Sequence, residues 1–323
     1  MTQRWLEVLD LLAGAVASAG PATVVVDGTD PAVVTSTAQR LASTVSAARE
    51  ARGDIARGDI ARGDIARGDG SIAIDGGGPR VVVWLRTSRR RHADEANRGD
   101  AADIVVDLHD PAWPVVRHID PRLLDHGRWY LRESRAFFGV RAATWDAKFG
   151  DDLPAYAAAV HRAGLPRGGA VLDAGCGTGR ALPALRAAVG PEGVVLGLDL
   201  TPQMLHVARA RGERLILGDA RRLPLAAASL DAVFAAGLVM HLPDATEGLR
   251  ELARVTVPGG HLVLFHPSGR AALAARHGRV LRPDEPLSRS PLTESCSRAG
   301  WTLTDYDDGD ERFFALAIRR ADR

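Results

Sequence analysis

The segment V-L-D-A-G-C-G-T-G-R at residues 171–180 constrains the fold more than any other part of the chain. Apolar residues lead into an acid, Asp173, and three alternating glycines follow before a helix-forming stretch. In doubly wound α/β folds, ligands bind where the first strand meets its helix. Glycines let the backbone approach a ligand there, and the helix N-terminus favours an anionic group. The segment therefore predicts a ligand site at the start of such a fold.

Strand and helix patterns alternate along this half of the chain. We expect strands at 170–173, 194–199, 215–217, 230–235, 261–266, 301–306 and 313–319, the last two as a closing hairpin. We expect helices at 180–189, 202–211, 246–257 and 292–299. Pro258-Gly259-Gly260 is expected to stop the third helix. The alternation predicts a doubly wound, mostly parallel seven-stranded α/β sheet.

The acids at the strand ends narrow the ligand class. The glycine spacing is G-x-G-x-G, with Arg180 where a dinucleotide fingerprint has its third glycine. Asp173 would repel a pyrophosphate but attract an ammonium or sulfonium group. Asp199 ends the next strand, 24 residues after Gly175, where a carboxylate usually holds ribose hydroxyls. Together these positions favour a nucleoside that carries an amino-acid tail.

Five blocks from about residue 135 to 319 resemble the class I S-adenosylmethionine-dependent methyltransferases, whose fold is Rossmann-like. The blocks are D-A-G-C-G-T-G-R, G-L-D-L-T-P-Q-M-L, G-D-A-R-R-L-P-L, L-D-A-V-F-A-A-G-L-V-M-H-L and P-G-G-H-L-V-L, in this order. The resemblance implies S-adenosylmethionine as the cofactor. It also implies transfer of the methyl group to an acceptor by in-line displacement at the sulfonium, for which the protein mainly supplies alignment and a dry pocket. A small-molecule acceptor is expected by elimination.

The resemblance also implies which residues meet the cofactor. They are Asp173, Gly175, Cys176, Gly177, Asp199, Leu200, Met204, Asp219, Ala220 and Ala236. Asp173 and the first two glycines would hold the methionine end, and Asp199 the ribose hydroxyls. Leu200 and Met204 would pack on the adenine, and Asp219 would accept a hydrogen bond from its amino group. Trp145 and Tyr156, before the first strand, are expected to cover the site.

Each of these residues has a structural alternative. The glycines would also suit a tight strand–helix turn, and Asp199 would suit a helix cap before Pro202. Asp219 would suit a turn cap, Met204 and Trp145 core packing, and Cys176 a small filler between glycines. The sequence alone leaves these alternatives open.

Two histidines are candidate general bases, needed only if the acceptor must lose a proton. His241 lies just past the fourth strand and His266 ends the fifth. A structural histidine is the alternative for both. No metal site is expected. The long segment 267–291, which follows His266, is expected to form a lid over the acceptor pocket. Four arginines in it suit a solvated face or, alternatively, recognition of an anionic acceptor: Arg270, Arg276, Arg279 and Arg282.

The N-terminal half predicts a smaller α/β domain over residues 1–125, with the methyltransferase-like domain at 126–323. Strands are expected at 23–26, 80–86 and 103–106, and helices at 33–45 and along the apolar spacing from Trp5 to Val16. An A-R-G-D-I repeat from Ala51 to Asp69 matches neither a strand nor a helix period, so a flexible insertion is expected at 51–78. The stretch 111–121 is expected to be linker-like.

This half weakly resembles the P-loop kinases of the uridine kinase type, since a strand ends at Asp27-Gly28 before a helix. A phosphate loop needs a second glycine and a lysine, and Val33 and Val34 stand at those positions. The resemblance therefore implies a degenerate P-loop-like domain that does not transfer phosphate. A structural or partner-docking role is expected, with a nucleoside or sugar kinase and a non-catalytic cofactor-binding scaffold as alternative functions for the chain.

The composition bears on the partners and the cellular location to expect. Lys and Arg number 41 and Asp and Glu 40, so a net charge of +1 gives no reason to expect a nucleic-acid or membrane-surface partner. Two cysteines fit a reducing compartment. No run is apolar enough to predict a membrane span, and we expect a cytoplasmic protein. The oligomeric state is left open.

Overall fold

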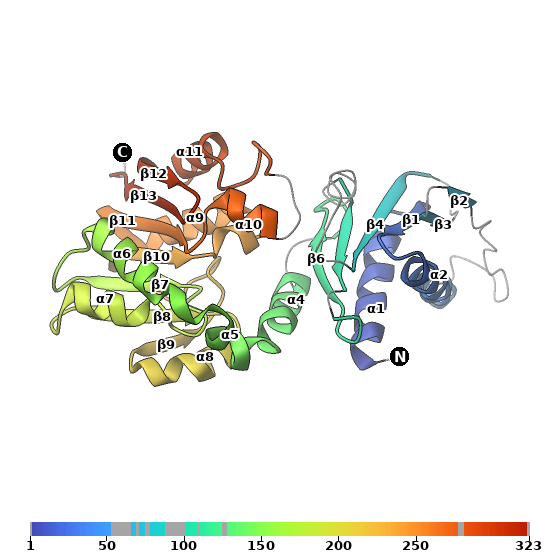
Figure 1. The fold of residues 1–323 in the computed structure, drawn as a ribbon. Coiled ribbons are helices and arrows are strands. Elements are labelled where there is room, and N and C mark those ends of the chain that lie inside the picture. Colours follow the sequence, from blue (N-terminus) through green and yellow to red (C-terminus); the bar gives the residue numbers. More distant parts are fainter. Residues whose placement is uncertain are drawn as a thin grey trace. The chain divides into compact units, whose positions relative to one another are not determined.

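The computed structural model describes residues 2–52, 66–68, 71–74, 78–87, 101–108, 110–124, 128–276 and 281–321. The chain divides into two compact units, each with its own sheet (Figure 1). Unit 1 contains residues 1–133 and 276–280, and unit 2 contains residues 134–275 and 281–323. The division thus falls within helix α4 (Arg128–Gly139) and not after residue 125 as expected. The buried Glu133 explains the difference, because it pairs with Arg4 and accepts the Val116 N–H, both in unit 1.

Unit 2 is built on a seven-stranded sheet in the order β12-β13-β11-β10-β7-β8-β9. The strands are β7 (Ala170–Ala174), β8 (Val194–Asp199), β9 (Arg214–Leu217), β10 (Leu230–Ala236), β11 (Thr256–His266), β12 (Trp301–Asp308) and β13 (Phe313–Arg319). Strands β7 to β11 pair in parallel, and β13 pairs antiparallel with both β11 and β12. The expected doubly wound, seven-stranded sheet with a closing hairpin is confirmed.

Helices cover both faces of this sheet because neighbouring strand residues point to opposite sides. Val171 and Phe234 pack with α6 (Leu153–Ala163) and α7 (Leu182–Val189) on one face. Leu172 and Val233 pack with α9 (Ala245–Val255) and α11 (Arg289–Arg298) on the other face (Figure 1). The shorter elements of unit 2 are α5 (Ala142–Phe149), η1 (Gly150–Asp152), α8 (Pro202–Ala208), η2 (Arg209–Arg211), η3 (Val239–His241) and α10 (Arg270–Arg276).

The expected helix stop at Pro258-Gly259-Gly260 is wrong in detail. Helix α9 already ends at Val255, and the Pro-Gly-Gly stretch lies inside β11. The pairing of β10 with β11 shifts register between Leu230 and Ala232, which accommodates the extra residues as a bulge. A Cβ on Gly260 would lie 2.5 Å from the Thr256 side chain, so the close approach within the bulge needs glycine.

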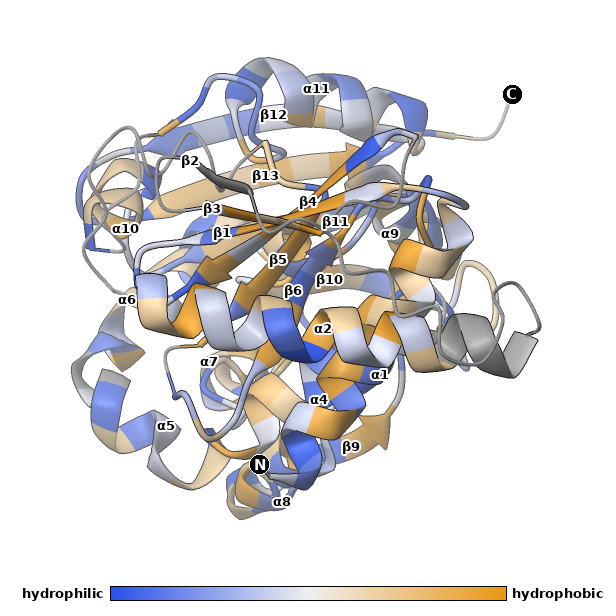
Figure 2. Ribbon diagram, turned by 90° about the vertical axis from the view of Figure 1, so that its right-hand side faces the viewer, coloured by the Kyte–Doolittle hydropathy of each residue, from blue (hydrophilic) through white to orange (hydrophobic). Residues whose placement is uncertain are grey.

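Unit 1 contains a six-stranded sheet in the order β2-β3-β1-β4-β5-β6. The strands are β1 (Thr23–Gly28), β2 (Ala66–Gly68), β3 (Ser71–Ile74), β4 (Arg80–Arg86), β5 (Ile104–Asp107) and β6 (Val115–Ile119). Strands β1, β4 and β5 run parallel and are strongly hydrophobic (Figure 2). Helix α1 (Gln3–Ser18) buries the expected apolar stripe except for Leu6, which is exposed, and α2 (Pro31–Arg52) packs beside it.

Two expectations about unit 1 are corrected. The insertion at 51–78 is not wholly irregular, because Ala66–Gly68 and Ser71–Ile74 pair with each other and β3 pairs with β1. The side chain of Ile72 is buried, which gives β3 an apolar anchor that the repeat lacks. Residues 53–65 of the repeat lie outside the described residues. The linker-like stretch 111–121 contains β6, whose Val115, Val116 and Ile119 are buried.

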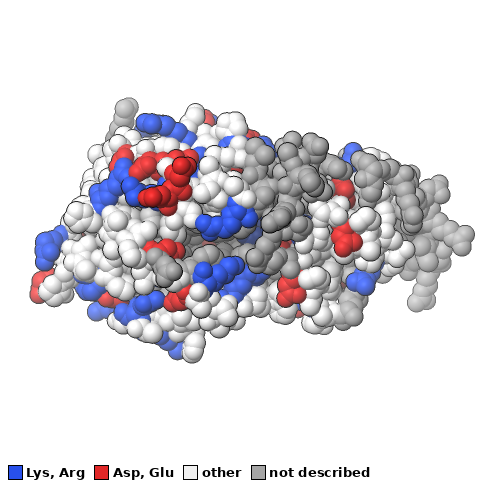
Figure 3. Space-filling model, viewed as in Figure 1, with Lys and Arg blue, Asp and Glu red and all other residues white. Residues whose placement is uncertain are grey.

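The charged side chains on the described surface agree with the near-neutral net charge of the sequence. Basic and acidic side chains lie interspersed on the face of unit 2 that Figure 3 presents. Arg162, for example, pairs with Asp305 and Asp307 on β12. Among the described residues, no helix is both long and apolar enough to cross a membrane.

Truncating Glu133 should destabilise unit 1. Its carboxylate and the Arg4 guanidinium are both almost fully buried, and removing Glu133 leaves the buried Arg4 charge with only the partly exposed Glu7 carboxylate as an acidic partner among the described residues. We expect Glu133→Ala to lower the free energy of unfolding by about 3–5 kcal/mol, measured by urea denaturation. Glu294→Ala, which removes an exposed pair with Arg298 on α11, is the control and should cost less than about 1 kcal/mol. Equal losses in the two variants would contradict the role of burial.

Candidate functional site

The expected site residues gather at one edge of the unit 2 sheet. Strands β7, β8, β9, β10 and β11 are parallel, so their carboxyl ends meet there. Asp173 is the next-to-last residue of β7, and Asp199 ends β8. Asp219 follows β9, Ala236 ends β10 and His266 ends β11. Ligands of open α/β sheets bind outside this edge, which makes it the candidate site.

The glycine loop between β7 and α7 is held close to β8. Gly175, Gly177 and Gly179 have φ values of +73°, +55° and +80°, a region that L side chains rarely adopt. The N–H groups of Gly175 and Cys176 donate to the Leu198 carbonyl at 2.7 and 2.9 Å. A Cβ on Gly177 would meet nothing within 4 Å, so this side of the loop faces open space. The loop is therefore shaped both by conformation and by pairing with β8.

The Asp199 carboxylate joins the loop to the next element. Its Oδ2 accepts the Gly177 N–H at 2.9 Å, and its Oδ1 accepts the Thr201 N–H at 2.7 Å. The structural alternative for Asp199 was a helix cap before Pro202, but the N-cap residue of α8 is Thr201, and the Thr201 bond makes Asp199 a turn residue just before the helix. Burial raises the pKa of Asp199, and the hydrogen bonds from Thr201 and Gly177 act in the opposite direction. The carboxylate is thus fixed in place with its charge facing the glycine loop.

Asp173 is the least satisfied polar group in the site. Its side chain is 1% exposed, and neither carboxylate oxygen has a hydrogen-bond partner among the described residues. Burial, together with the charge of Asp199, raises the pKa of Asp173 to about 8. A buried carboxylate without partners is costly, so a cation placed beside it would be strongly stabilised. The role of Asp173 as a contact to a positively charged ligand stays a prediction.

The other expected cofactor residues lie around the same edge, and they either contact other residues of the chain or are buried. Asp219 forms an ion pair with Arg221 at 2.8 Å and also accepts the Arg221 N–H, as a turn residue would. The Leu200 carbonyl accepts the Arg135 Nε–H at 2.9 Å. Cys176, Met204 and Ala220 are buried, and burial raises the pKa of the Cys176 thiol well above its usual value. Their assignment to a bound cofactor stays a prediction.

The two candidate bases lie at the same edge in different surroundings. His241 ends η3, and its ring meets the edge of Phe138 at 5.3 Å between centroids. Phe138 in turn lies 5.9 Å from Trp145, which places Trp145 in an aromatic group beside the loop that follows β10. The His266 ring lies 3.8 Å from where a Cβ on Gly237 would stand, in that same loop. His266 Nδ1 interacts with the backbone of Ser268.

A charged group over the glycine loop was not predicted. Asp146 of α5 accepts the Thr178 hydroxyl at 2.5 Å and pairs with Arg180 and Arg211 at 3.3 and 3.0 Å. Arg180 is buried and also pairs with Asp152. The sequence signal was the arginine in place of a third glycine, but its partners lie 28 and 34 residues away along the chain. This group holds α5 against the glycine loop.

Tyr156, expected to cover the site, packs beside Arg180 of this charged group. The Arg180 guanidinium lies 5.7 Å from its ring centroid, and the ring packs against Phe265 at 5.1 Å. Burial raises the pKa of Tyr156, with the Asp152 charge adding to the effect. The hydroxyl therefore stays protonated at neutral pH. The ring stands between the cation and the apolar core below it.

Residues 172–264 match the model of a family described as "Methyltransferase domain". Residues 172–264 of unit 2 are therefore similar to a methyltransferase domain. The match runs from β7 to β11 and so includes Asp173, the glycine loop, Asp199 and Asp219. It covers none of unit 1.

Curated relatives match a similar length of chain. An uncharacterised 37.1 kDa protein in transposon TN4556 of Streptomyces fradiae is 40% identical over 105 residues, which are 31% of this chain and 30% of that protein. A demethylmenaquinone methyltransferase of Geobacillus kaustophilus is 40% identical over 116 residues, which are 34% of this chain and 50% of that protein. The chain thus spans half or less of the length of these relatives.

A solved structure of an S-adenosylmethionine-dependent methyltransferase from Aquifex aeolicus is 24% identical. The similarity covers 49% of this chain and 86% of that chain, with a TM-score of 0.42. The fold assignment of unit 2 rests on its own strand order and not on this similarity.

Neutralising Asp173 should stabilise the ligand-free protein in a pH-dependent way. Because its pKa is raised to about 8 in the folded state, the folded protein keeps a proton that the unfolded chain releases above about pH 4. Stability of the wild type should therefore fall as pH rises towards 8, by at most about 1.4 kcal/mol per pH unit. We expect Asp173→Asn to raise the melting temperature more at pH 8 than at pH 5, measured by calorimetry.

The control for this experiment is Asp10→Asn, on the exposed side of α1. It should change the melting temperature little at either pH. A gain in Asp173→Asn that is the same at pH 5 and pH 8 would show that the carboxyl group is not protonated by its burial.

Proposed function

We propose that the chain is a class I S-adenosylmethionine-dependent methyltransferase that acts on a small-molecule acceptor. The methyltransferase domain match and the sheet order β12-β13-β11-β10-β7-β8-β9 support the fold and the domain type. The observation that carries the proposal is Asp173, a buried carboxylate without hydrogen-bond partners among the described residues at the start of the glycine loop. A positively charged ligand would compensate this group, and a pyrophosphate would not.

The residues present fit this cofactor. The open space at Gly177 allows a ligand to approach the backbone. Asp199 is held at the end of β8 by two backbone N–H groups, and its remaining lone pairs suit ribose hydroxyls. When bound, S-adenosylmethionine would supply an activated methyl group. The chain would supply alignment and a site shielded from water.

The other predicted contacts keep their roles in this proposal. Asp219 would accept a hydrogen bond from the adenine amino group in place of part of its pairing with Arg221. Leu200, Met204 and Ala220 would border the adenine, and Ala236 would lie near the reacting methyl group. Gly175 and Cys176 would form the remainder of the loop around the methionine end.

Fewer observations bear on the identity of the acceptor than on the identity of the cofactor. The relatives whose printed name is demethylmenaquinone methyltransferase support a small-molecule acceptor of some kind. His241 or His266 would remove a proton where the acceptor requires it, without a metal ion. We further propose a cytoplasmic location. None of these assignments requires a nucleic acid or a membrane.

For unit 1 we propose a degenerate P-loop-like domain without phosphate transfer. Gly28 ends β1 shortly before α2 begins at Pro31, which is the strand–helix order of the P-loop kinases that this half resembles. Val34, which stands in the lysine position, has an exposed fraction of 0% and belongs to the core. A Cβ on Gly28 would lie 2.7 Å from the Leu85 carbonyl, so the glycine serves close packing of β1 on β4. A kinase function would instead require ATP turnover by the full chain that Asp199→Ala leaves unchanged.

Titration calorimetry with S-adenosylmethionine tests the proposed function. The intact chain should bind the cofactor, and Asp199→Ala should weaken binding by about 100-fold or more, since it removes a fixed carboxylate that two ligand hydroxyls would use. Asp10→Ala, on the exposed side of α1, should bind as the wild type does. Absence of binding in a folded wild-type protein would reject the proposal.

A second measurement separates catalysis from binding. The chain should transfer label from methyl-labelled S-adenosylmethionine to a component of a small-metabolite extract. Tight cofactor binding without any transfer would favour the alternative of a non-catalytic, cofactor-binding scaffold.

A further inference from the structure

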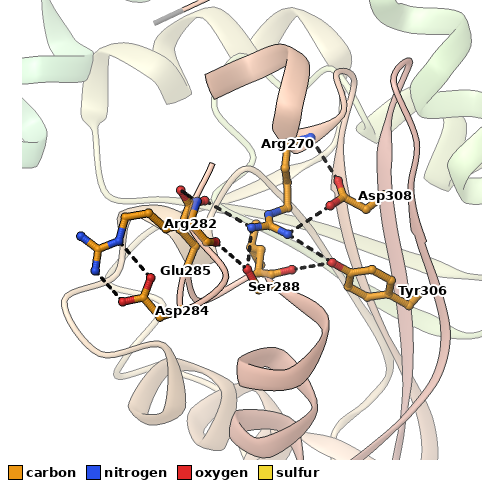
Figure 4. Close-up of polar contacts among 8 residues, drawn as sticks. Arg270, Arg282, Asp284, Glu285, Ser288, Tyr306 and Asp308 are labelled. Carbon is orange, nitrogen blue, oxygen red and sulfur yellow. Dashed lines mark hydrogen bonds and ion pairs between the residues drawn. The ribbon is translucent and has the colours of Figure 1, made fainter. Parts of the chain in front are cut away.

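Arg270, the first residue of α10, has a buried guanidinium in the segment that follows β11. Its exposed fraction is 7%, although the arginines of this segment were expected to be solvated or to meet an anion. That expectation is wrong for Arg270, because carboxylates of this chain already surround it (Figure 4). Arg282, in contrast, makes an exposed pair with Asp284, as a solvated residue does.

The contacts of Arg270 connect three separate parts of unit 2. One terminal nitrogen donates to Asp308 Oδ2 at 3.1 Å and to the Tyr306 hydroxyl at 3.3 Å, both on β12. The other donates to Ser288 Oγ at 2.7 Å and Glu285 Oε2 at 3.3 Å, just before α11. The forked guanidinium therefore fixes the start of α10 between β12 and the chain that leads into α11 (Figure 4).

The backbone beside Arg270 is fixed as well. The Arg270 N–H donates to Asp308 Oδ1 at 3.1 Å, and the Gly269 N–H donates to the Asp310 carbonyl at 3.2 Å. A Cβ on Gly269 would lie 1.7 Å from the Gly309 carbonyl oxygen. The chain at Gly269 thus lies directly against the turn between β12 and β13, and only glycine allows this contact.

This fixed backbone begins one residue after Ser268, which contacts His266. His266 Nδ1 lies 3.1 Å from the Ser268 nitrogen and 3.0 Å from the Ser268 carbonyl oxygen. If Nδ1 accepts from the N–H, the proton of the neutral ring is on Nε2, and if Nδ1 donates to the carbonyl, Nε2 is the basic nitrogen. The position of the Ser268 backbone therefore contributes to which ring nitrogen can act as a base.

We propose that Arg270 is a positioning residue that sets the orientation and tautomer of His266 through the backbone of Ser268 and Gly269. The consequence for methyl transfer rests on the proposed function, but the coupling of Arg270 to His266 does not. The His266 ring lies beside Gly237 in the loop after β10. A change in the orientation or tautomer of the ring would therefore act at the place where the reacting groups are expected to meet.

The neighbours of Arg270 favour a stable arrangement. The Tyr306 hydroxyl donates to the Leu287 carbonyl at 3.0 Å while it accepts from Arg270. Burial raises the pKa of Tyr306, so it keeps the proton that this bond needs. The Arg289 guanidinium lies 5.5 Å from the Tyr306 ring centroid and adds a second cation beside the two carboxylates. A lysine at position 270 could not reach all four side-chain partners.

Nitrogen NMR of the histidine rings tests the coupling without any acceptor. Full-length protein labelled with ¹⁵N only at histidine would be compared as wild type and as Arg270→Gln, with His266→Gln used to assign the signals. We expect Arg270→Gln to change the ratio of the two His266 tautomers by a factor on the order of five, since one hydrogen bond of Nδ1 is weakened. Arg270→Lys should restore the ratio only partly.

The controls separate positioning from folding. Arg298→Gln, which removes an exposed pair on α11, should leave the His266 signals as in the wild type. If Arg270→Gln does not fold, Tyr306→Phe removes one partner of Arg270 with little change in packing and should shift the same signals in the same direction. Unchanged His266 signals in the folded variant that is measured would overturn the proposal.

Calorimetry with S-adenosylmethionine on the same variants distinguishes this proposal from the proposed function. Cofactor affinity in Arg270→Gln or Tyr306→Phe should stay within about twofold of the wild type, because the cofactor contacts lie at β7 to β10. A wild type that does not bind the cofactor would defeat the proposed function while leaving the NMR result to decide the role of Arg270.

Discussion

The hydrogen bond from the Gly177 N–H to Asp199 is the interaction on which the site depends. It ties the glycine loop after β7 to the end of β8, at the centre of a parallel sheet. The loop is then fixed with Gly177 facing open space and with Asp173 buried below it. Because Asp199 adds its own charge near a carboxylate that burial already disfavours, the two acids together create a place for a cation.

Around this centre, two buried arginines hold separate elements of unit 2 together through their carboxylate partners. Arg180 is buried between Asp146 and Asp152 and holds α5 over the loop. Arg270 is buried among groups from β12 and the chain before α11. Both connect elements of unit 2 that are far apart in the chain. Each is stable because its carboxylate partners are fixed by the same fold.

The strands of unit 2 were predicted closely, because continuous apolar runs ending in turn residues are strong signals. Val194–Asp199 has the predicted bounds, and the closing pair β12 and β13 was expected as a hairpin. The Pro-Gly-Gly stretch was misjudged because a bulge in β11 depends on register with β10, which local sequence does not contain. In unit 1, β6 was missed because prolines surround it, and β3 because it follows a repeat with no apolar period.

The sequence by itself determined the order of elements, the glycine loop and the acids at the strand ends. These follow from local periodicity and from backbone conformations that only glycine readily adopts. Only the tertiary structure decided which charges are buried and which partners they have. The sequence marks Asp173 as a candidate ligand contact but does not show that it has no hydrogen-bond partner among the described residues, and it does not distinguish Arg270, which has four side-chain partners, from the other arginines of its segment. Burial and pairing arise between segments far apart in the chain, so no local pattern encodes them.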